Sequence, residues 1–504
     1  MMEALLPLFV VIPLGFAFIT AVLGRYIPRF HRIVIPLVFL ALAGLSAWMM
    51  ANIRENILLY MVGGWEPVNG IPIGIHLSAD GLSVLLLVII NTLAFFSAFY
   101  SYAYIEHYTS GQYFYALFCL MVAGMNGVAI TGDIFNLYVF LEIAAIASYA
   151  LVAFGIKKEE LEASFKYQVL GGLGSLFILF GIGVLYWATG TLNMADMHKL
   201  LGSAPASPGI VFAGVLLLAG FGIKSAMVPF HSWLPDAHSS APSPISAMLS
   251  GVLIKAIGIY CLFRFFFNLF AVSVQFAYGI TTLGVISMIV GGFLAINQWD
   301  TKRLLAYSSI SQMGYVVMST GIGMILLCRG GDMKIAALAI FGGVYHLVNH
   351  AFFKGLLFLN AGALEYRLQT RDLLKMGGLA QAMPVTSATS LVASMAISGI
   401  PPFNGFFSKL IIIIAAVRAG FYGLAILAVI VSIITLAYYL KFQRYAFYGK
   451  PSESGLPEKD VPFSMKGTMI LLALCCLLLS VLVFPSLRNL FLMPAVHALI
   501  NMTL

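Results

Sequence analysis

Charged side chains are scarce in this sequence. Asp, Glu, Lys and Arg together form only 9% of the 504 residues, whereas hydrophobic residues form 61%. A soluble domain cannot hide that much apolar surface, because the buried fraction of a protein rises too slowly with chain length. The composition therefore excludes a soluble protein. We assign the net charge of +8 to loops that flank a membrane rather than to nucleic-acid binding.

Cysteine is sparse as well. The five cysteines form no CxxC pair, so the chain offers no iron–sulfur, zinc or nickel site, and we expect no cofactor in it. All five are expected to be small apolar residues of helices: Cys119, Cys261, Cys328, Cys475 and Cys476. An aspartate-rich DDxxD cluster is also missing, which argues against an intramembrane lipid transferase.

Long polar connections are lacking too. Instead, continuous apolar runs of about twenty residues recur along the chain, each long enough to cross a hydrocarbon core of ~30 Å. They predict an all-α polytopic membrane protein with fourteen spans and exclude a β-barrel, whose runs alternate. The spans lie near residues 3–22, 31–51, 78–104, 112–130, 133–154, 164–188, 208–230, 243–267, 272–297, 302–326, 334–362, 385–413, 418–444 and 466–485.

The order of the spans predicts a single membrane domain over residues 1–504. Two spans broken by proline lie five helices apart, which suggests a five-helix unit whose second copy is inverted. A shift of 185 residues places Lys409 on Lys224 but Leu327 on Glu142, so the copies have diverged chemically. The expected parts are N-terminal helices at 1–104, five-helix units at 112–267 and 272–444, and a C-terminal helix and tail at 466–504.

Lysine and arginine divide unevenly between the two predicted sides of the membrane. One side holds 16 of the 27 residues and the other holds 7, while the remaining 4 fall inside spans. Because basic loops stay in the cytoplasm, we expect a cell-membrane protein with both chain termini outside.

Prolines interrupt the seventh and twelfth spans. Pro229 cannot donate to the carbonyl of Ser225, and its ring crowds that carbonyl, so the seventh span should kink or break there. The twelfth span contains SGIPPFNGF, in which Pro401 and Pro402 make a continuous helix unexpected. Such breaks at membrane depth require protein or a water-filled cavity around them. Each break has a lysine within about two turns.

Ionisable residues inside the spans form the candidate functional site. They are Glu142, Lys224, Lys255, His346, His350, Lys354 and Lys409. One such charge costs ~2.5–3.5 kcal/mol at a helix centre, so the set requires buried partners or water. Burial and a movable carboxylate can load and unload a lysine near neutral pH, and histidine already titrates there. The set therefore predicts a proton relay.

Other polar residues leave alternatives open. His231, Asp236 and His238 in FHSWLPDAH form either a point of proton uptake or a polar turn. The two histidines of HLVNH have the i, i+4 spacing of a metal site, but they lack the zincin glutamate and a third ligand, so metal is disfavoured. Three acidic residues at span ends are expected at the membrane interface: Asp80, Glu106 and Asp133.

The stretch GIKSAMVPFHSWLPDAHSSAPSPISAMLSGVLIKAIGIY (222–260) resembles the signature of the antiporter-like membrane subunits. AYSSISQMGY (306–315) and GIPPFNGFFSK (399–409) match the same family, and the resemblance runs from about Leu77 to Tyr448. This family includes the proton-pumping subunits of respiratory complex I, Mrp-type sodium/proton antiporter subunits, and subunits of membrane-bound hydrogenases and formate hydrogenlyase.

The resemblance implies a fourteen-helix fold with two inverted five-helix units and discontinuous seventh and twelfth helices. It also implies roles: Glu142 pairs with Lys224, Lys255 is the bridging lysine, His346 and His350 belong to the connecting axis, and Lys409 is the terminal group.

The leading hypothesis is a non-redox, ion-translocating subunit of a redox-driven complex. The chain stops at Leu504 without a long C-terminal helix, so it resembles the middle-length subunits of membrane-bound hydrogenase or complex I. Expected partners are related membrane subunits and a peripheral redox arm, with protons as cargo, sodium ions as a further candidate cargo, and no nucleic acid. The alternative is a dedicated Mrp-type Na⁺/H⁺ antiporter subunit without redox partners, which would use the same residues.

Overall fold

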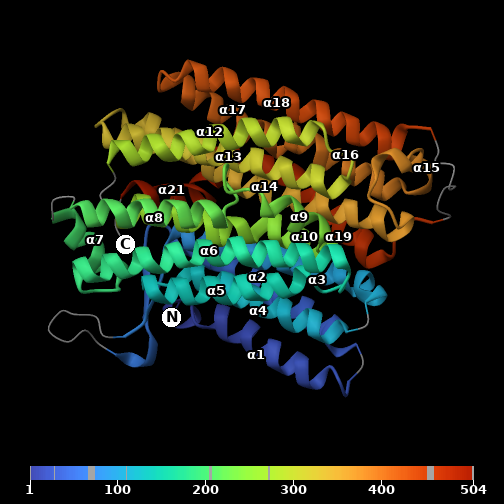
Figure 1. The fold of residues 1–504 in the computed structure, drawn as a ribbon, viewed down its shortest axis with the longest axis horizontal. Coiled ribbons are helices and arrows are strands. Elements are labelled where there is room, and N and C mark those ends of the chain that lie inside the picture. Colours follow the sequence, from blue (N-terminus) through green and yellow to red (C-terminus); the bar gives the residue numbers. More distant parts are fainter. Residues whose placement is uncertain are drawn as a thin grey trace.

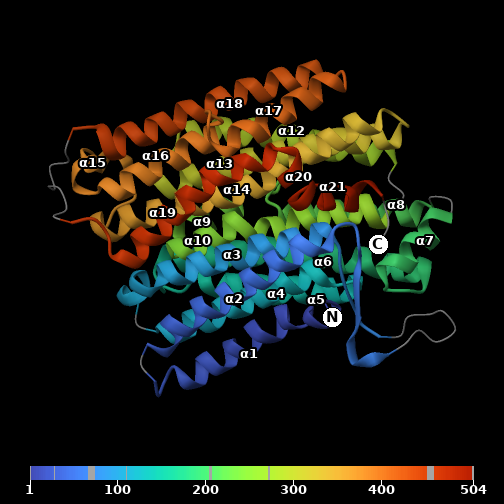
Figure 2. The ribbon, with the colours of Figure 1, turned by 180° about the vertical axis from the view of Figure 1, so that it is seen from behind.

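A bundle of long helices forms the molecule (Figures 1 and 2). The computed structural model describes residues 2–27, 29–65, 74–108, 110–203, 207–270, 273–450 and 459–501. Within these ranges, twelve helical segments are long and apolar enough to cross a membrane. The predicted all-α polytopic architecture is thereby confirmed.

The bounds of the elements follow the predicted spans closely. The long helices are α1 (Leu8–Leu23), α2 (Phe30–Ile53), α3 (Gly81–Tyr104), α4 (Gly111–Ile130), α5 (Ile134–Val152), α6 (Lys158–Thr189), α12 (Val274–Ile296), α13 (Thr301–Cys328), α14 (Met333–Leu368), α18 (Tyr422–Gln443) and α19 (Phe463–Leu478). The predicted eighth span is a composite of α10 (Ser243–Met248), η4 (Leu249–Leu253), η5 (Lys255–Tyr260), α11 (Cys261–Phe263) and η6 (Arg264–Leu269). Shorter elements are β1 (Leu58–Met61), β2 (His76–Ala79), α7 (Met194–Ser203), α8 (Pro208–Lys224), α9 (Trp233–Ser240), α15 (Leu379–Ala382), α16 (Pro384–Ser398), α17 (Asn404–Arg418), α20 (Pro485–Phe491) and α21 (Met493–Ile500).

The two predicted interruptions are present. Helix α8 ends at Lys224 and α9 begins at Trp233, with Pro229 in the turn between them. At the end of α8 the Ile223 carbonyl accepts from the Ala226 backbone N–H and from the Trp233 indole, each at 3.0 Å, which ties the turn to the end of the broken helix. The second break separates α16 from α17 at Gly399, whose φ of 80° is easily reached by glycine.

The composite eighth span departs from a regular α-helix. Segments η4, η5 and η6 are π-helical, and every residue from Ser243 to Leu269 is buried. A wider π-turn changes the direction of the side chains that follow it and is frequent at functional sites. The apolar pattern of this span does not distinguish an α-helix from a π-helix, because every residue of the span is buried in either case.

Glycines bring α12 and α13 close together. A Cβ at Gly284 would lie 2.6 Å from the Met318 nitrogen, and one at Gly291 would lie 2.5 Å from the Ser311 nitrogen. The Ser311 hydroxyl donates to the Met288 carbonyl across the same contact at 2.8 Å. Small residues let membrane helices pack by van der Waals contact. This contact fixes α13, which carries several polar side chains toward the interior.

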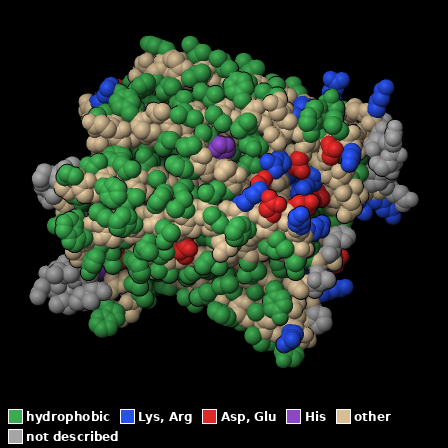
Figure 3. Space-filling model, in the orientation of Figure 1, with side chains coloured by type: hydrophobic (Ala, Val, Ile, Leu, Met, Phe, Trp, Pro, Cys, Tyr) green, Lys and Arg blue, Asp and Glu red, His purple; other side chains and the backbone are tan. Residues whose placement is uncertain are grey.

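The two ends of the bundle differ in character. The antiparallel β1–β2 hairpin and α7 lie at one end, on the left in Figure 1, and α15 lies at the opposite end. Figure 3 shows basic and acidic side chains gathered toward that right-hand end, while hydrophobic side chains dominate the rest of this face. A broad apolar surface of this kind suits contact with lipid.

Candidate proton relay

An ion pair joins α5 to the end of α8. Glu142 Oε1 lies 3.4 Å from Lys224 Nζ, with 23% and 1% of the respective side chains exposed. The Ser175 hydroxyl of α6 donates to the same carboxylate oxygen. Helix α8 stops at Lys224, so the lysine lies directly at the break. The predicted pairing of Glu142 with Lys224 is therefore present in the structure.

Lys255 lies beside this pair, on the neighbouring π-helical segment. Gly258 of η5 packs against Ser225, the residue that follows Lys224, and any side chain at Gly258 would clash there. Lys255 is fully buried, and its ammonium group donates to the carbonyls of Ser250, at 2.9 Å, and Gly251. Two backbone carbonyls thus hold a charge that bulk solvent does not reach.

Lys354 of α14 is linked to the same segment. Its ammonium group donates to the Leu305 carbonyl at 2.6 Å and to the Tyr439 hydroxyl at 3.2 Å. The Ser309 hydroxyl also donates to Leu305 O, at 3.0 Å, and lies 2.7 Å from the Ser250 hydroxyl. Because Ser250 supplies a carbonyl to the lysine of η5, a serine–serine bridge connects the surroundings of the two buried lysines.

Two fully buried histidines lie within the field of these lysines. The charges of Lys255 and Lys354 both act on His238 and His350. Among the described residues, neither ring nitrogen of His350 has a hydrogen-bond partner, and the His238 ring makes only a weak contact with the Leu234 carbonyl. Buried nitrogens without protein partners are usual positions for ordered water. The two imidazoles therefore mark a polar gap that water can bridge.

We call the buried lysines and histidines from Lys255 to Lys409 the row. It continues to Lys409 through His346. His346 Nδ1 lies 2.9 Å from the Ser408 hydroxyl, and Nε2 lies 3.1 Å from Gln312 Oε1. Ser408 is followed in the chain by Lys409, whose ammonium group donates to the Ser432 hydroxyl at 3.2 Å. Lys409 and Ser432 also line a cavity of about 250 Å³ beside the second helix break. These contacts complete the row.

Asp236 and His231 lie apart from the row. Asp236 accepts from Arg303 at 2.6 Å and from Lys166 at 3.0 Å, which ties α9 to α13 and α6. Partial burial acts to raise the pKa of Asp236, but these two cations outweigh it and hold the pKa below its ordinary value. His231 lies half-buried in the turn before α9. The histidine-containing segment is thus divided: His238 is fully buried within the field of Lys354 and Lys255, and Asp236 belongs to an ion-pair network.

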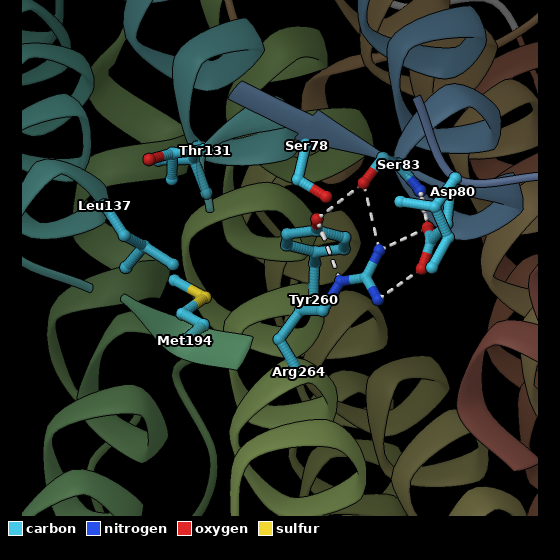
Figure 4. A pocket seen from close by; sticks show the side chains of 10 residues that line it. Ser78, Asp80, Ser83, Thr131, Leu137, Met194, Tyr260 and Arg264 are labelled. Atoms are coloured by element: carbon cyan, nitrogen blue, oxygen red, sulfur yellow. Dashed lines mark hydrogen bonds and ion pairs between the residues drawn. The ribbon is translucent and has the colours of Figure 1, made fainter. Parts of the chain in front are cut away.

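A second buried ion pair was not expected from the sequence. Arg264 of η6 donates to both carboxylate oxygens of Asp80 and to Ser83 and Tyr260, as Figure 4 shows, and to Asn268. Asp80 stands at the start of α3, as the sequence predicted for a residue at a span end, but only 9% of its side chain is exposed. The two residues are 184 positions apart, so no local pattern could pair them.

A third pair was also missed. Lys302 Nζ lies 2.6 Å from Glu365 Oε2, and the lysine also donates to the Ala241 carbonyl at 3.1 Å. Lys302 is buried, whereas part of Glu365 reaches the surface. Glu365 lies on α14 three turns beyond Lys354, and 29% of its side chain is exposed, so this end of the helix reaches the surface.

The row and its surroundings match a known family. The sequence profile of the NADH:quinone oxidoreductase/Mrp antiporter transmembrane family matches residues 131–435, which span Glu142 to Lys409. The chain belongs to this family. It is an antiporter-like membrane subunit, and the resemblance seen in the sequence motifs is confirmed.

Curated relatives come from two kinds of system. The chain is 35% identical over 470 residues to NADH-quinone oxidoreductase subunit N of Desulforudis audaxviator, covering 92% of this chain and 90% of that one. It is 34% identical over 407 residues to a Na⁺/H⁺ antiporter subunit of Alkalihalophilus pseudofirmus, covering 80% and 79%.

Solved structures show the same division. A chain of the Mrp complex from Dietzia sp. superposes with a TM-score of 0.89 at 26% identity, covering 99% of this antiporter-like subunit and 98% of that chain. A chain of the membrane-bound sulfane sulfur reductase, an archaeal respiratory membrane complex, superposes with a TM-score of 0.85 at 28% identity, covering 100% and 99%.

Proposed function

We propose that this chain is the proton-translocating subunit of a redox-driven membrane complex. The observation that carries the proposal is the Glu142–Lys224 ion pair, whose lysine is buried and which lies beside a polar row that reaches Lys409. Relatives named as a subunit of NADH-quinone oxidoreductase and as part of a sulfane sulfur reductase support a redox assembly. Electron transfer would take place in a peripheral arm, and related antiporter-like subunits would adjoin this chain in the membrane.

The relay works through changes in charge state. At an effective dielectric constant of 20, a carboxylate about 4 Å from an ammonium group attracts it by on the order of 4 kcal/mol. Withdrawal of Glu142 from Lys224 removes this attraction, so the lysine releases its proton toward Lys255. The proton then passes along Lys354 and the histidines and leaves near Lys409. His238, Asp236 and His231 form the side from which protons are taken up.

The proposed setting is the cell membrane, with both chain termini outside. The excess of Lys and Arg on one predicted side, 16 against 7, supports this orientation. The whole chain acts as one membrane domain, with five-helix units at 112–267 and 272–444. In each unit a lysine flanks the helix break, which supports the repeat.

Gentle purification from the native membrane, followed by mass spectrometry, tests the proposed setting. Co-purification of iron–sulfur and dehydrogenase- or hydrogenase-like proteins is the expected result. Within that complex, Lys224→Ala and Glu142→Ala should abolish coupled proton transport while assembly is retained. Lys334→Ala removes an exposed lysine at a helix start and serves as the control. Full coupled proton transport by both relay variants would refute the mechanism.

The alternative is a subunit of a Mrp-type Na⁺/H⁺ antiporter without redox partners. The match to the Alkalihalophilus antiporter subunit and the TM-score of 0.89 with the Dietzia Mrp complex favour this candidate. It predicts that only small membrane proteins co-purify. Vesicles would then lose a proton gradient when Na⁺ is added but not when choline is added.

A further inference from the structure

Three hydroxyl groups form a connected chain that starts at Lys354. The Lys354 ammonium donates to the Tyr439 hydroxyl at 3.2 Å, and this hydroxyl lies 3.0 Å from Ser308 Oγ. The Tyr438 hydroxyl donates to the same serine oxygen at 2.9 Å. All three side chains are buried, the tyrosines on α18 and the serine on α13. We call Tyr439, Ser308 and Tyr438 the hydroxyl chain.

The far end of the hydroxyl chain lies next to His346. Tyr438 lies beside the amide of Gln312, whose Oε1 is 3.1 Å from His346 Nε2. The Gln312 amide nitrogen is buried and makes no well-formed hydrogen bond within the described ranges; its contact is with the Tyr438 hydroxyl. To turn, the amide gives up this weak contact and the hydrogen bond of its oxygen to His346. Gln312 therefore separates the last hydroxyl from the imidazole by a single movable side chain.

The hydroxyl chain bridges the distance between Lys354 and His346, which no direct contact on α14 spans. Lys354 and His346 are eight residues apart on this helix, or about 12 Å along its axis. His350 lies between them in the sequence, but both of its nitrogens lack partners among the residues described. Direct contacts, in contrast, lead from Lys354 through three hydroxyls without interruption. The side route through α13 and α18 is thus the better-connected one.

We propose that the hydroxyl chain carries protons between Lys354 and His346. The inference rests on the relay proposed above and names further carriers in it. In the structure the Tyr438 hydroxyl donates to Ser308, so it must first turn its O–H away from the serine and toward His346. Tyr439 then accepts a proton from the ammonium group as its own hydroxyl proton moves to Ser308, and the serine passes its proton to Tyr438. His346 Nε2 receives the last proton once the Gln312 amide has turned aside. One proton enters and one leaves, each hydroxyl stays neutral, and the three hydroxyls end pointing the other way.

Removal of single hydroxyls tests the proposal. Tyr439→Phe and Tyr438→Phe keep the aromatic rings, and Ser308→Ala removes one oxygen. In the native complex reconstituted in vesicles, each should slow proton transport on the order of tenfold or more. Ser308→Thr restores a hydroxyl and should recover much of the rate. The matched control is Tyr100→Phe, because the buried Tyr100 hydroxyl donates only to a backbone carbonyl, at 2.8 Å.

The outcomes separate this proposal from the one on which it rests. Wild-type rates of proton transport in Tyr439→Phe and Tyr438→Phe, together with no transport in Lys224→Ala, would refute the hydroxyl chain as a proton path but not the relay. Wild-type rates in all of them would overturn both. An equal loss in Tyr100→Phe would assign the effect to packing and also overturn the hydroxyl chain. A larger solvent deuterium isotope effect in Ser308→Thr than in wild type would support it.

Discussion

Replacement of Arg264 by Gln should destabilise the protein severely. The guanidinium group makes hydrogen bonds to Asp80, Ser83, Tyr260 and Asn268, and only 6% of its side chain is exposed. The substitution leaves the Asp80 carboxylate buried without a counter-charge. Loss of one partner of such a pair costs about 3–5 kcal/mol. In the Asp80→Asn/Arg264→Gln double variant no charge is left unpaired, so it should lose less than the sum of the two single variants.

A double-mutant cycle on the purified complex measures this coupling. Thermal unfolding in detergent, followed by the fluorescence of the protein, gives the stability of the wild type, both single variants and the double variant. The control pair is Arg32 with Glu106, 2.7 Å apart, in which half of the glutamate is exposed. Its coupling should fall within about 0–1 kcal/mol. Additive losses at Arg264 and Asp80, with no coupling beyond that of the control, would refute the reasoning.

Two further predictions concern the charged end and the α12–α13 contact. Because Arg303 and Lys166 hold the pKa of Asp236 below its ordinary value, the ion-pair network should contribute stability above pH of about 4 and lose it only as the pH falls further. In Asp236→Asn the thermal midpoint should fall less than in the wild type as the pH is lowered below about 4. An unchanged dependence of the midpoint on pH would contradict this prediction. Gly284→Ala should lower the midpoint, since the new Cβ would lie 2.6 Å from the Met318 nitrogen; Gly279→Ala, with open space around it, should not.

Much of the fold followed from composition and from residue type. The apolar runs placed the long helices, because a backbone in lipid must satisfy its own hydrogen bonds and a helix of about twenty residues does so. Pro229 and the Pro401–Pro402 pair located both helix breaks, because proline removes a donor wherever it lies. Such rules act locally and need no knowledge of the neighbours in space.

The candidate site was foreseeable only in part. Glu142, Lys224 and Lys409 stood out because a charge inside an apolar run is expensive. The pairing of Glu142 with Lys224, however, was implied by the family resemblance and not by the spacing of the two residues. The ion pair of Asp80 with Arg264 was not foreseen, since Arg264 lies 184 residues away on a segment that looked like an ordinary span. The cost of burial identifies a charged residue, but it does not identify the partner.

Sequence alone thus established the lipid environment, the helices, their interruptions and part of the set of buried charges, without Arg264, Lys302 and Glu365. The tertiary structure decided which groups meet: Lys224 with Glu142, and Lys302 with Glu365. It also decided that a serine bridge connects the surroundings of Lys255 and Lys354, and that serine and tyrosine hydroxyls lead from Lys354 toward His346, which no hydropathy pattern signals. The physical reason is that helix formation depends on neighbours along the chain, whereas hydrogen bonds between side chains depend on how separate helices pack against one another.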